Sequence, residues 1–301
     1  MMEINIDKIG MGWIPDLPDY RDYSPEHKEI KPTIKKLGIE KTDGLELPGT
    51  VDLRPWFSPI ENQGSLGSCT ANAGVGLIEY YERKAFGTHI DASRLFLYKV
   101  TRNLLGWDWD YGAYMKTTMG AMALFGVPPE KYWPYTDRKN PGPSGKRTFN
   151  EEPPAFLYSF AQNYQAIRYF RLDPSGTAPN ILLQRIKAFL AAKLPSFFGF
   201  TVYISINQAG TAGKIPFPCP GEGIRGGHGI VAVGYDDSMV IKNTICGKKT
   251  TGALLIRNSW GTGWGDSGYG WLPYEYVLRG LARDWWTLFK MEYTGTNNFG
   301  I

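Results

Sequence analysis

The sequence predicts an α+β protein with a mainly helical lobe (about 60–150) followed by a mainly β lobe (about 155–294). Two observations support this prediction. Apolar residues recur at helical spacing in 69–86 and 114–127, whereas the second half holds short apolar and aromatic runs typical of strands. Gly- and Pro-rich loops separate these runs. A layer of helices and a β-sheet bury their apolar faces against one another, so we expect a cleft between the two lobes. Clefts between lobes are favoured positions for active sites.

The composition is that of an ordinary globular protein and excludes several classes. The 301 residues suffice for one large core or two modest ones, and 43% of them are hydrophobic. A net charge of +4 without a basic block indicates neither nucleic-acid nor membrane binding. No apolar run approaches the roughly 18 residues of a transmembrane helix, and the N-terminus lacks the apolar region of a signal peptide. We therefore expect a cytoplasmic location, or export without a recognisable signal peptide, and neither metal nor cofactor.

Residues 1–46, which we call the leader, are expected to lie over the rest of the chain. Three prolines before residue 26 exclude a long helix in its first part, and a Lys- and Glu-rich stretch follows. Trp13, Ile14, Leu17 and Tyr20 would be unusual in a disordered tail, so they are the expected anchors. A floppy terminus is the alternative.

Residues 47–60 form an extended entry to the tight loop 61–68 and the helix 69–86. Cys69 lies at the N-terminus of this helix, where unpaired N–H groups and the helix dipole favour thiolate over thiol. Gln63 can fold back beside it as an amide donor, and acyl transfer needs donors aimed at a developing oxyanion. A cysteine at a helix start is usually only a small buried hydrophobe, so the rest of the site decides between these interpretations.

The other elements follow the hydrophobic pattern. Asp91 or Ser93 can cap a short helix, and 132–154 is a polar loop. A strand at 166–172 and an amphipathic helix at 180–193 begin the second half. Later strands are expected at 196–204, 228–237, 253–260 and 285–293.

The second half supplies a base and a group to orient it. His228 opens a strand after two glycines, so its side chain can lean into a cleft and take the Cys69 proton. Asn258 lies at a strand end and can accept a hydrogen bond from the second imidazole nitrogen. Trp260 would shield that bond from water. Taken alone, a histidine in a strand is more often structural.

These motifs resemble the papain-like cysteine peptidases. Gln63, the Gly-Ser-Cys at 67–69, GGHGIVAVGY at 226–235 and NSWGTGWGDSGYG at 258–270 follow the order of that family. The likeness covers residues 47–294. The leader resembles that of the bacterial short-leader branch that includes xylellain.

The resemblance implies a papain-like fold, with a helical L domain and an R domain based on a β-barrel. It also implies peptide hydrolysis through an acyl-enzyme, with Cys69 as nucleophile, His228 as base and acid, and Asn258 as the orienting group. Gln63 and the Cys69 backbone N–H would form the oxyanion hole. The peptidase domain would follow the leader, over 47–301.

The family pattern also indicates the residues that contact substrate. These are Gly67, Gly112, Ala113, Tyr114, Met115, Gly227 and Trp260. Gly112 and Ala113 stand where the family has a Gly-Gly pair. With Tyr114 and Met115 nearby, the second specificity pocket is expected to be apolar.

The sequence departs from the family signature C-G-[SA]-C-[WY]. Leu66 replaces the first cysteine and Thr70 the aromatic residue, so the disulfide usual in secreted members is absent. This absence favours a reducing compartment, or no dependence on oxidation. If Cys69 is free, Cys219 and Cys246 could pair. From the family we also expect a depressed pKa for Cys69.

We expect a cysteine endopeptidase that acts on peptide or protein substrates, with its leader as an intramolecular inhibitor. A catalytically silent homologue that binds peptides or a partner is the alternative. A transglutaminase or a peptidase of ubiquitin-like tails would lack the run 258–270. An extended, tethered leader can run along a cleft and block it, provided that it crosses Cys69 in a non-productive direction or register. Residues 26–41 would be its hinge and processing stretch.

Overall fold

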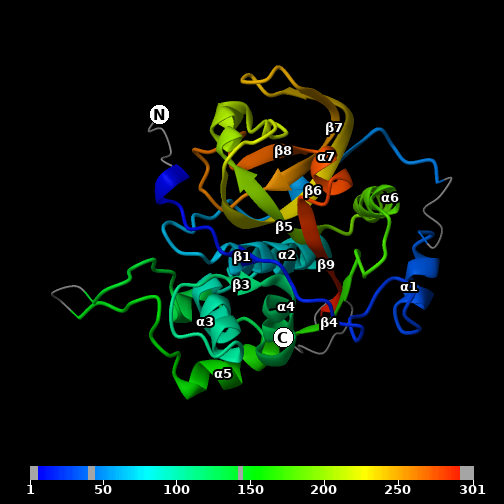
Figure 1. Ribbon diagram of the computed structural model, residues 1–301. Coiled ribbons are helices and arrows are strands. Elements are labelled where there is room, and N and C mark those ends of the chain that lie inside the picture. The colour runs from blue at the N-terminus through cyan, green and yellow to red at the C-terminus, as the bar shows by residue number, and fades with distance from the viewer. Residues whose placement is uncertain (1–5, 40–44, 142–144, 292–301) are drawn as a thin grey trace.

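Helix α2 (Cys69–Phe86) lies between a sheet and a group of helices (Figure 1). The computed structural model describes residues 6–39, 45–141 and 145–291. The helix ends where expected, at Gly87, whose φ of 75° is the left-handed backbone that favours glycine. Because both layers pack on α2, even Asn72 and Glu79 are buried, and Glu79 accepts the Ala92 N–H at 3.0 Å.

The helical layer contains the next elements of the chain, as expected. Its helices are α3 (Arg94–Leu104), α4 (Met115–Phe125) and α5 (Ala155–Ala161), with 3₁₀ turns at Arg54–Trp56, Glu130–Tyr132 and Gln162–Tyr164. The cap of α3 is Ser93 rather than Asp91, because the Ser93 hydroxyl accepts the Phe96 N–H at 3.1 Å. The sequence pattern did not predict α5.

The second layer is a seven-stranded sheet in the order β4-β9-β5-β6-β7-β8, with β2 paired to β6. Its strands are β2 (Thr50–Asp52), β4 (Ala166–Arg171), β5 (Ser196–Tyr203), β6 (Ile224–Lys242), β7 (Lys249–Arg257), β8 (Tyr269–Pro273) and β9 (Ala282–Met291). All its pairs are antiparallel. Helix α6 (Pro179–Ala191), the 3₁₀ helix η5 (Ile204–Ala212) and α7 (Glu275–Leu278) connect them. The expected strands are confirmed, although β6 is much longer than expected and β8 was not predicted.

The leader runs between the two layers, as the blue trace in Figure 1 shows. After a 3₁₀ turn at Ile6–Lys8, its strand β1 (Trp13–Ile14) pairs in parallel with β3 (Ala113–Tyr114). Trp13 is buried, so this anchor is confirmed. Leu17 and Tyr20 are not anchors, because they are 74% and 97% exposed.

The stretch expected to be a hinge is instead packed on the protein. Helix α1 (Lys31–Lys36) forms within it, and Ile30, Ile34 and Ile39 join the apolar core. Three buried isoleucines hold this part of the leader in place, so the hinge prediction is wrong for residues 26–39. Residues 40–44 lie outside the described part of the chain.

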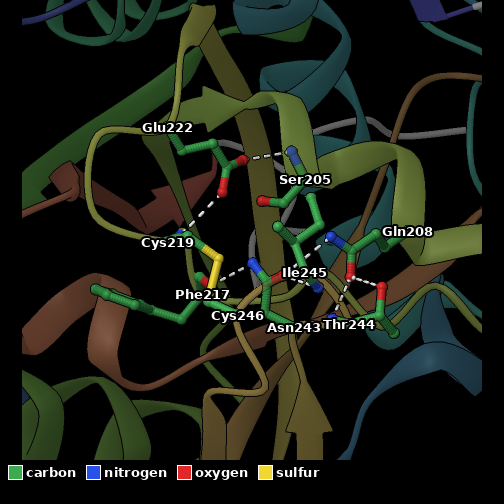
Figure 2. Close-up of a disulfide and its surroundings, with 9 residues drawn as sticks. All are labelled: Ser205, Gln208, Phe217, Cys219, Glu222, Asn243, Thr244, Ile245 and Cys246. Atoms are coloured by element: carbon green, nitrogen blue, oxygen red, sulfur yellow. Dashed lines mark hydrogen bonds between the residues drawn. A yellow bond between two sulfur atoms is a disulfide. The ribbon is translucent and has the colours of Figure 1, made fainter.

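A disulfide joins Cys219, in the loop before β6, to Cys246, between β6 and β7 (Figure 2). Around it, the Glu222 carboxylate accepts the backbone N–H groups of Cys219 and Ser205, and Asn243 donates to the Phe217 carbonyl. The pairing that the sequence left open is therefore present.

Candidate active site

The N-terminus of α2, with Cys69, meets the first part of β6, with His228. Cys69 is the first residue of α2 and is fully buried. A Cβ added to Gly229, the neighbour of His228, would lie 3.4 Å from Thr70 N and 3.5 Å from Cys69 C. Because glycine stands at this position, the strand can approach the first turn of the helix closely. Chain segments far apart in sequence thus bring the first turn of α2, which carries Cys69, against the strand that carries His228.

The His228 ring is oriented from behind by Asn258. The His228 Nε2 lies 2.8 Å from Asn258 Oδ1, and this oxygen also accepts the Ser259 N–H at 2.8 Å. An amide oxygen can only accept, so Nε2 carries the proton in the neutral ring and Nδ1 is left as an acceptor. Among the described residues, His228 Nδ1 has no hydrogen-bond partner. No hydrogen bond joins it to the Cys69 thiol in this structure, and it is available as a proton acceptor.

Trp260 covers this hydrogen bond, as the sequence predicts. Its ring centroid lies 4.7 Å from that of His228, and the residue is 1% exposed. Trp264 in turn makes an edge-on ring contact with Trp260. Excluding water strengthens the His228–Asn258 bond, because competing hydrogen bonds are removed.

Gln63 is fixed so that one of its amide N–H groups points to the leader. Its Oε1 accepts the Ser259 hydroxyl at 2.6 Å, which defines the orientation of the amide. Its Nε2 donates to Leu66 O at 2.8 Å and to Gly10 O of the leader at 2.9 Å. A donor that the sequence assigned to an oxyanion therefore binds a peptide carbonyl in this structure.

The leader backbone lies directly on the predicted substrate-contacting residues. Ala113 N donates to Gly12 O at 2.7 Å. A Cβ on Gly12 would lie 1.8 Å from Gly67 O, and one on Gly112 would lie 2.2 Å from Gly12 O. Gly112 has a φ of 86°, so both its conformation and its surroundings require glycine.

Two more of the predicted contact residues lie against the same strand of the leader. Tyr114 pairs with Ile14, and Gly227 lies against the Trp13 carbonyl. Met115 begins α4, and its methyl group reaches Gly229, next to His228. The leader thus contacts Gly67, Gly112, Ala113, Tyr114 and Gly227, whereas Trp260 packs on His228.

The charge state of the pair under the leader differs from the expectation. Burial raises the pKa of the Cys69 thiol to about 11, although the N–H groups of Gly229, Gly12 and Thr70 act against this. Burial also lowers the pKa of His228 to about 4, against the effect of its bond to Asn258. Both shifts are opposite in direction to the depressed thiol pKa expected from the family, and they favour a neutral thiol and a neutral imidazole in this structure.

Sequence reasoning missed the groups that hold the walls of the site. Asp110 Oδ1 accepts the Gly67 N–H at 2.9 Å and the Tyr98 hydroxyl at 2.6 Å, and that hydroxyl accepts the Gly112 N–H at 3.2 Å. These contacts join the two glycine loops that flank the leader. The role of Ser259, which binds both Asn258 and Gln63, was also missed. This residue lies within the motif 258–270, so the motif could have indicated it.

The pocket that holds the Trp13 ring is not purely apolar. The ring lies against Gly199 and Gly227, and the indole N–H donates to the buried Asp284 at 3.0 Å. Asp284 lies in an aromatic strand far along the chain, so no local pattern pointed to it. The apolar second specificity pocket expected from Tyr114 and Met115 stays a prediction.

The described residues contain no group of three or more His, Cys, Asp or Glu arranged to hold a metal ion. Within the same part of the chain, no helix has the length and apolar character needed to cross a bilayer.

Comparison with known proteins places this geometry in a family. The model of the papain family of cysteine proteases matches residues 47–277. An uncharacterized peptidase C1-like protein of Acanthamoeba polyphaga mimivirus is 32% identical, over 99% of this chain and 92% of that protein. Papain of Carica papaya is 27% identical, over 79% of this chain and 59% of that protein.

Solved structures agree with these sequence matches. Xylellain, a cysteine protease from Xylella fastidiosa, is 33% identical and superposes with a TM-score of 0.73, covering 96% of this chain and 98% of that one. Procathepsin L 3 of Tenebrio molitor larval midgut has a TM-score of 0.57 at 20% identity, covering 83% of this chain and 72% of that one. The second likeness shows the fold alone.

Proposed function

The chain belongs to the papain family of cysteine proteases, and we propose that it is an endopeptidase that works through Cys69, His228 and an acyl-enzyme. Its α+β, two-lobe fold is the one expected from the sequence. We further propose that the leader, residues 1–46, is an intramolecular inhibitor of the peptidase domain over 47–301. The family match begins at residue 47, which supports this boundary.

Each residue of the site has one step in the reaction. His228 Nδ1 takes the Cys69 proton, and the sulfur attacks the substrate carbonyl carbon. Gln63 Nε2 and the Cys69 N–H donate to the oxygen as it gains negative charge. The His228 imidazolium then gives its proton to the leaving amine, and the carbonyl re-forms as a thioester. Water, deprotonated by His228, releases the acid and restores the thiol.

Asn258 is a positioning residue in this scheme. Its Oδ1 accepts from Nε2 at 2.8 Å and so keeps Nδ1 free and aimed away from Asn258. The imidazolium formed during the reaction keeps the same bond. Ser259 supports both halves of the site, because its N–H binds Asn258 and its hydroxyl binds Gln63.

The observation that carries the proposal is the contact between Gln63 Nε2 and the Gly10 carbonyl at 2.9 Å. The leader presents a peptide carbonyl to the donor assigned to the oxyanion, and the backbone N–H of its Gly12 contacts the buried thiol of Cys69. A peptide substrate would present its own carbonyl to the same donor. The leader therefore occupies the groups that substrate needs.

The test uses the full chain, folded with its leader and then cut. A recognition sequence for a site-specific protease is inserted between Leu45 and Glu46, which are both exposed. Once cut, the leader is no longer tethered and dissociates on dilution. We expect a thiol-directed epoxide to label Cys69 and peptides to be hydrolysed after the cut, and both reactions to be much slower before it.

Cys69→Ala is the matched control for the cut protein. It should leave less than about a thousandth of the activity, as the loss of a nucleophile does in triad enzymes. Cut protein that neither reacts with the epoxide nor hydrolyses any peptide would support the silent homologue instead. Equal activity of the intact and the cut protein would remove the inhibitory role of the leader.

A further inference from the structure

The leader side chain Trp13 fills a pocket that adjoins the proposed base. A Cβ added to Gly199 of β5 would lie 2.0 Å from the indole Cε2, and one added to Gly227 of β6 would lie 2.8 Å from Cε3. The antiparallel register of β5 and β6 puts both glycines on one face of the sheet. Gly227 directly precedes His228. Two missing side chains thus leave a flat platform the size of an aromatic ring.

One end of this pocket carries a carboxylate. Asp284 Oδ2 accepts the Trp13 indole N–H at 3.0 Å and the Asp16 backbone N–H at 2.8 Å. The other oxygen, Oδ1, accepts from Arg171 at 2.6 Å. The Asp284 side chain is 3% exposed. A buried acceptor of this kind selects for a donor, because leaving it unpaired costs free energy.

The position of Asp284 is fixed by the peptidase domain and not by the leader. Its backbone has a φ of 58°, a left-handed conformation unusual outside glycine. Its N–H donates to Asp173 Oδ2 at 2.8 Å, and Arg171 Nε donates to Asp173 Oδ1 at 2.9 Å. These contacts involve no leader residue, so they can persist when the leader departs.

Departure of the leader leaves half of this carboxylate without partners. Asp284 Oδ2 loses both donors that the leader supplies, whereas Oδ1 keeps Arg171. Arg171 keeps its contacts with both Asp284 and Asp173. The emptied pocket then presents one unpaired acceptor oxygen, at the position where the leader places an indole N–H donor.

We propose that Asp284 is a specificity-determining residue, and that the uncovered pocket takes a tryptophan side chain of the peptide substrate. The glycine platform receives the ring, and Asp284 Oδ2 accepts the indole N–H. Phenylalanine has the flat ring but no donor, and leucine has neither. This inference rests on the proposed peptidase function and names the class of peptide that the site prefers.

The test is a positional scan with the protein cut at the inserted site. Peptides carry tryptophan, 1-methyltryptophan, phenylalanine, leucine or arginine at each position in turn. We expect one position at which tryptophan raises kcat/KM about tenfold over 1-methyltryptophan, because methylation removes only the N–H donor. This comparison needs no variant of the protein.

Two variants then separate the acceptor from the platform. In Asp284→Asn the amide oxygen would turn to Arg171 and the amide N–H groups to the pocket, so the preference for tryptophan over 1-methyltryptophan should fall to within about twofold. Gly199→Ala should instead lower kcat/KM for tryptophan and phenylalanine relative to leucine, since its Cβ fills the ring site. Arg283→Ala is the control, because Arg283 is the exposed neighbour of Asp284 and should leave the ratios unchanged.

The outcomes distinguish this inference from the proposed function. Cut protein that labels with the epoxide and hydrolyses peptides, but prefers leucine or arginine to tryptophan at every position, overturns the inference alone. An unchanged tryptophan to 1-methyltryptophan ratio in Asp284→Asn also overturns it. Failure to label Cys69 and to hydrolyse any peptide counts against the peptidase itself.

Discussion

Gly12→Ala should open the site without altering any residue of the peptidase domain. The added methyl group would lie 1.8 Å from the carbonyl oxygen of Gly67. The backbone fixes the position of the alanine Cβ, and the Gly67 oxygen is itself a backbone atom. No side-chain rotation can therefore relieve the overlap. The leader must therefore leave its groove around Gly12.

The size of the effect follows from the contacts that are lost with it. Two hydrogen bonds, from Ala113 N to Gly12 O and from Gln63 Nε2 to Gly10 O, each contribute about 1 kcal/mol. Removing the buried Trp13 ring from its pocket costs roughly another 3 kcal/mol. A total of about 5 kcal/mol shifts the equilibrium between covered and open sites by more than a thousandfold.

The assay compares hydrolysis of a short peptide by uncut full-length proteins, with mass spectrometry to confirm that each is intact. We expect Gly12→Ala to approach the rate of the cut protein, and Gly10→Ala to act alike because its Cβ would lie 2.2 Å from Leu66 O. Gly49→Ala is the matched control, since its Cβ meets no atom within 4 Å. Equal rates for intact Gly12→Ala and the unmodified protein would refute the reasoning.

Three further predictions concern Asn258, Asp16 and the disulfide. Asn258→Ala should lower kcat of the cut protein less than His228→Ala, because it disorders the base without removing it, and an equal or larger loss for Asn258→Ala would contradict its positioning role. Burial raises the pKa of Asp16 in the leader from 3.8 to about 7, so the docked leader holds a proton that the free leader releases. Docking should weaken as pH rises from about 4 to about 7, and the activity of intact relative to cut protein should rise over that window; in Asp16→Asn this rise should be smaller than in the unmodified protein. Replacing Cys219 and Cys246 together by serine should lower the free energy of unfolding by up to about 3.5 kcal/mol, since the disulfide closes a loop with a sequence separation of 27. Denaturant unfolding measures that loss, and reduction of the unmodified protein should reproduce it.

The sequence alone determined those features that depend on neighbouring residues. The helix 69–86, its cysteine at the first position and its stop at Gly87 all follow from local spacing and backbone preference. The succession of helices and strands also follows from local patterns. The order of Gln63, Cys69, His228 and Asn258 can likewise be read directly along the chain. Hydrophobic periodicity and capping act over a few residues, so they can be read along the chain.

Only the tertiary structure decided which distant groups meet and how deeply they are buried. Trp13 and Asp284 lie at opposite ends of the chain, yet they share a hydrogen bond in one pocket. Leu17 has the same apolar character as the buried Ile34, but one is exposed and the other packed. The raised pKa of Cys69 has the same origin, because the leader and the sheet remove water from a thiol that its own helix would ionise. Burial depends on every element packed around a residue, and a local pattern contains none of that information.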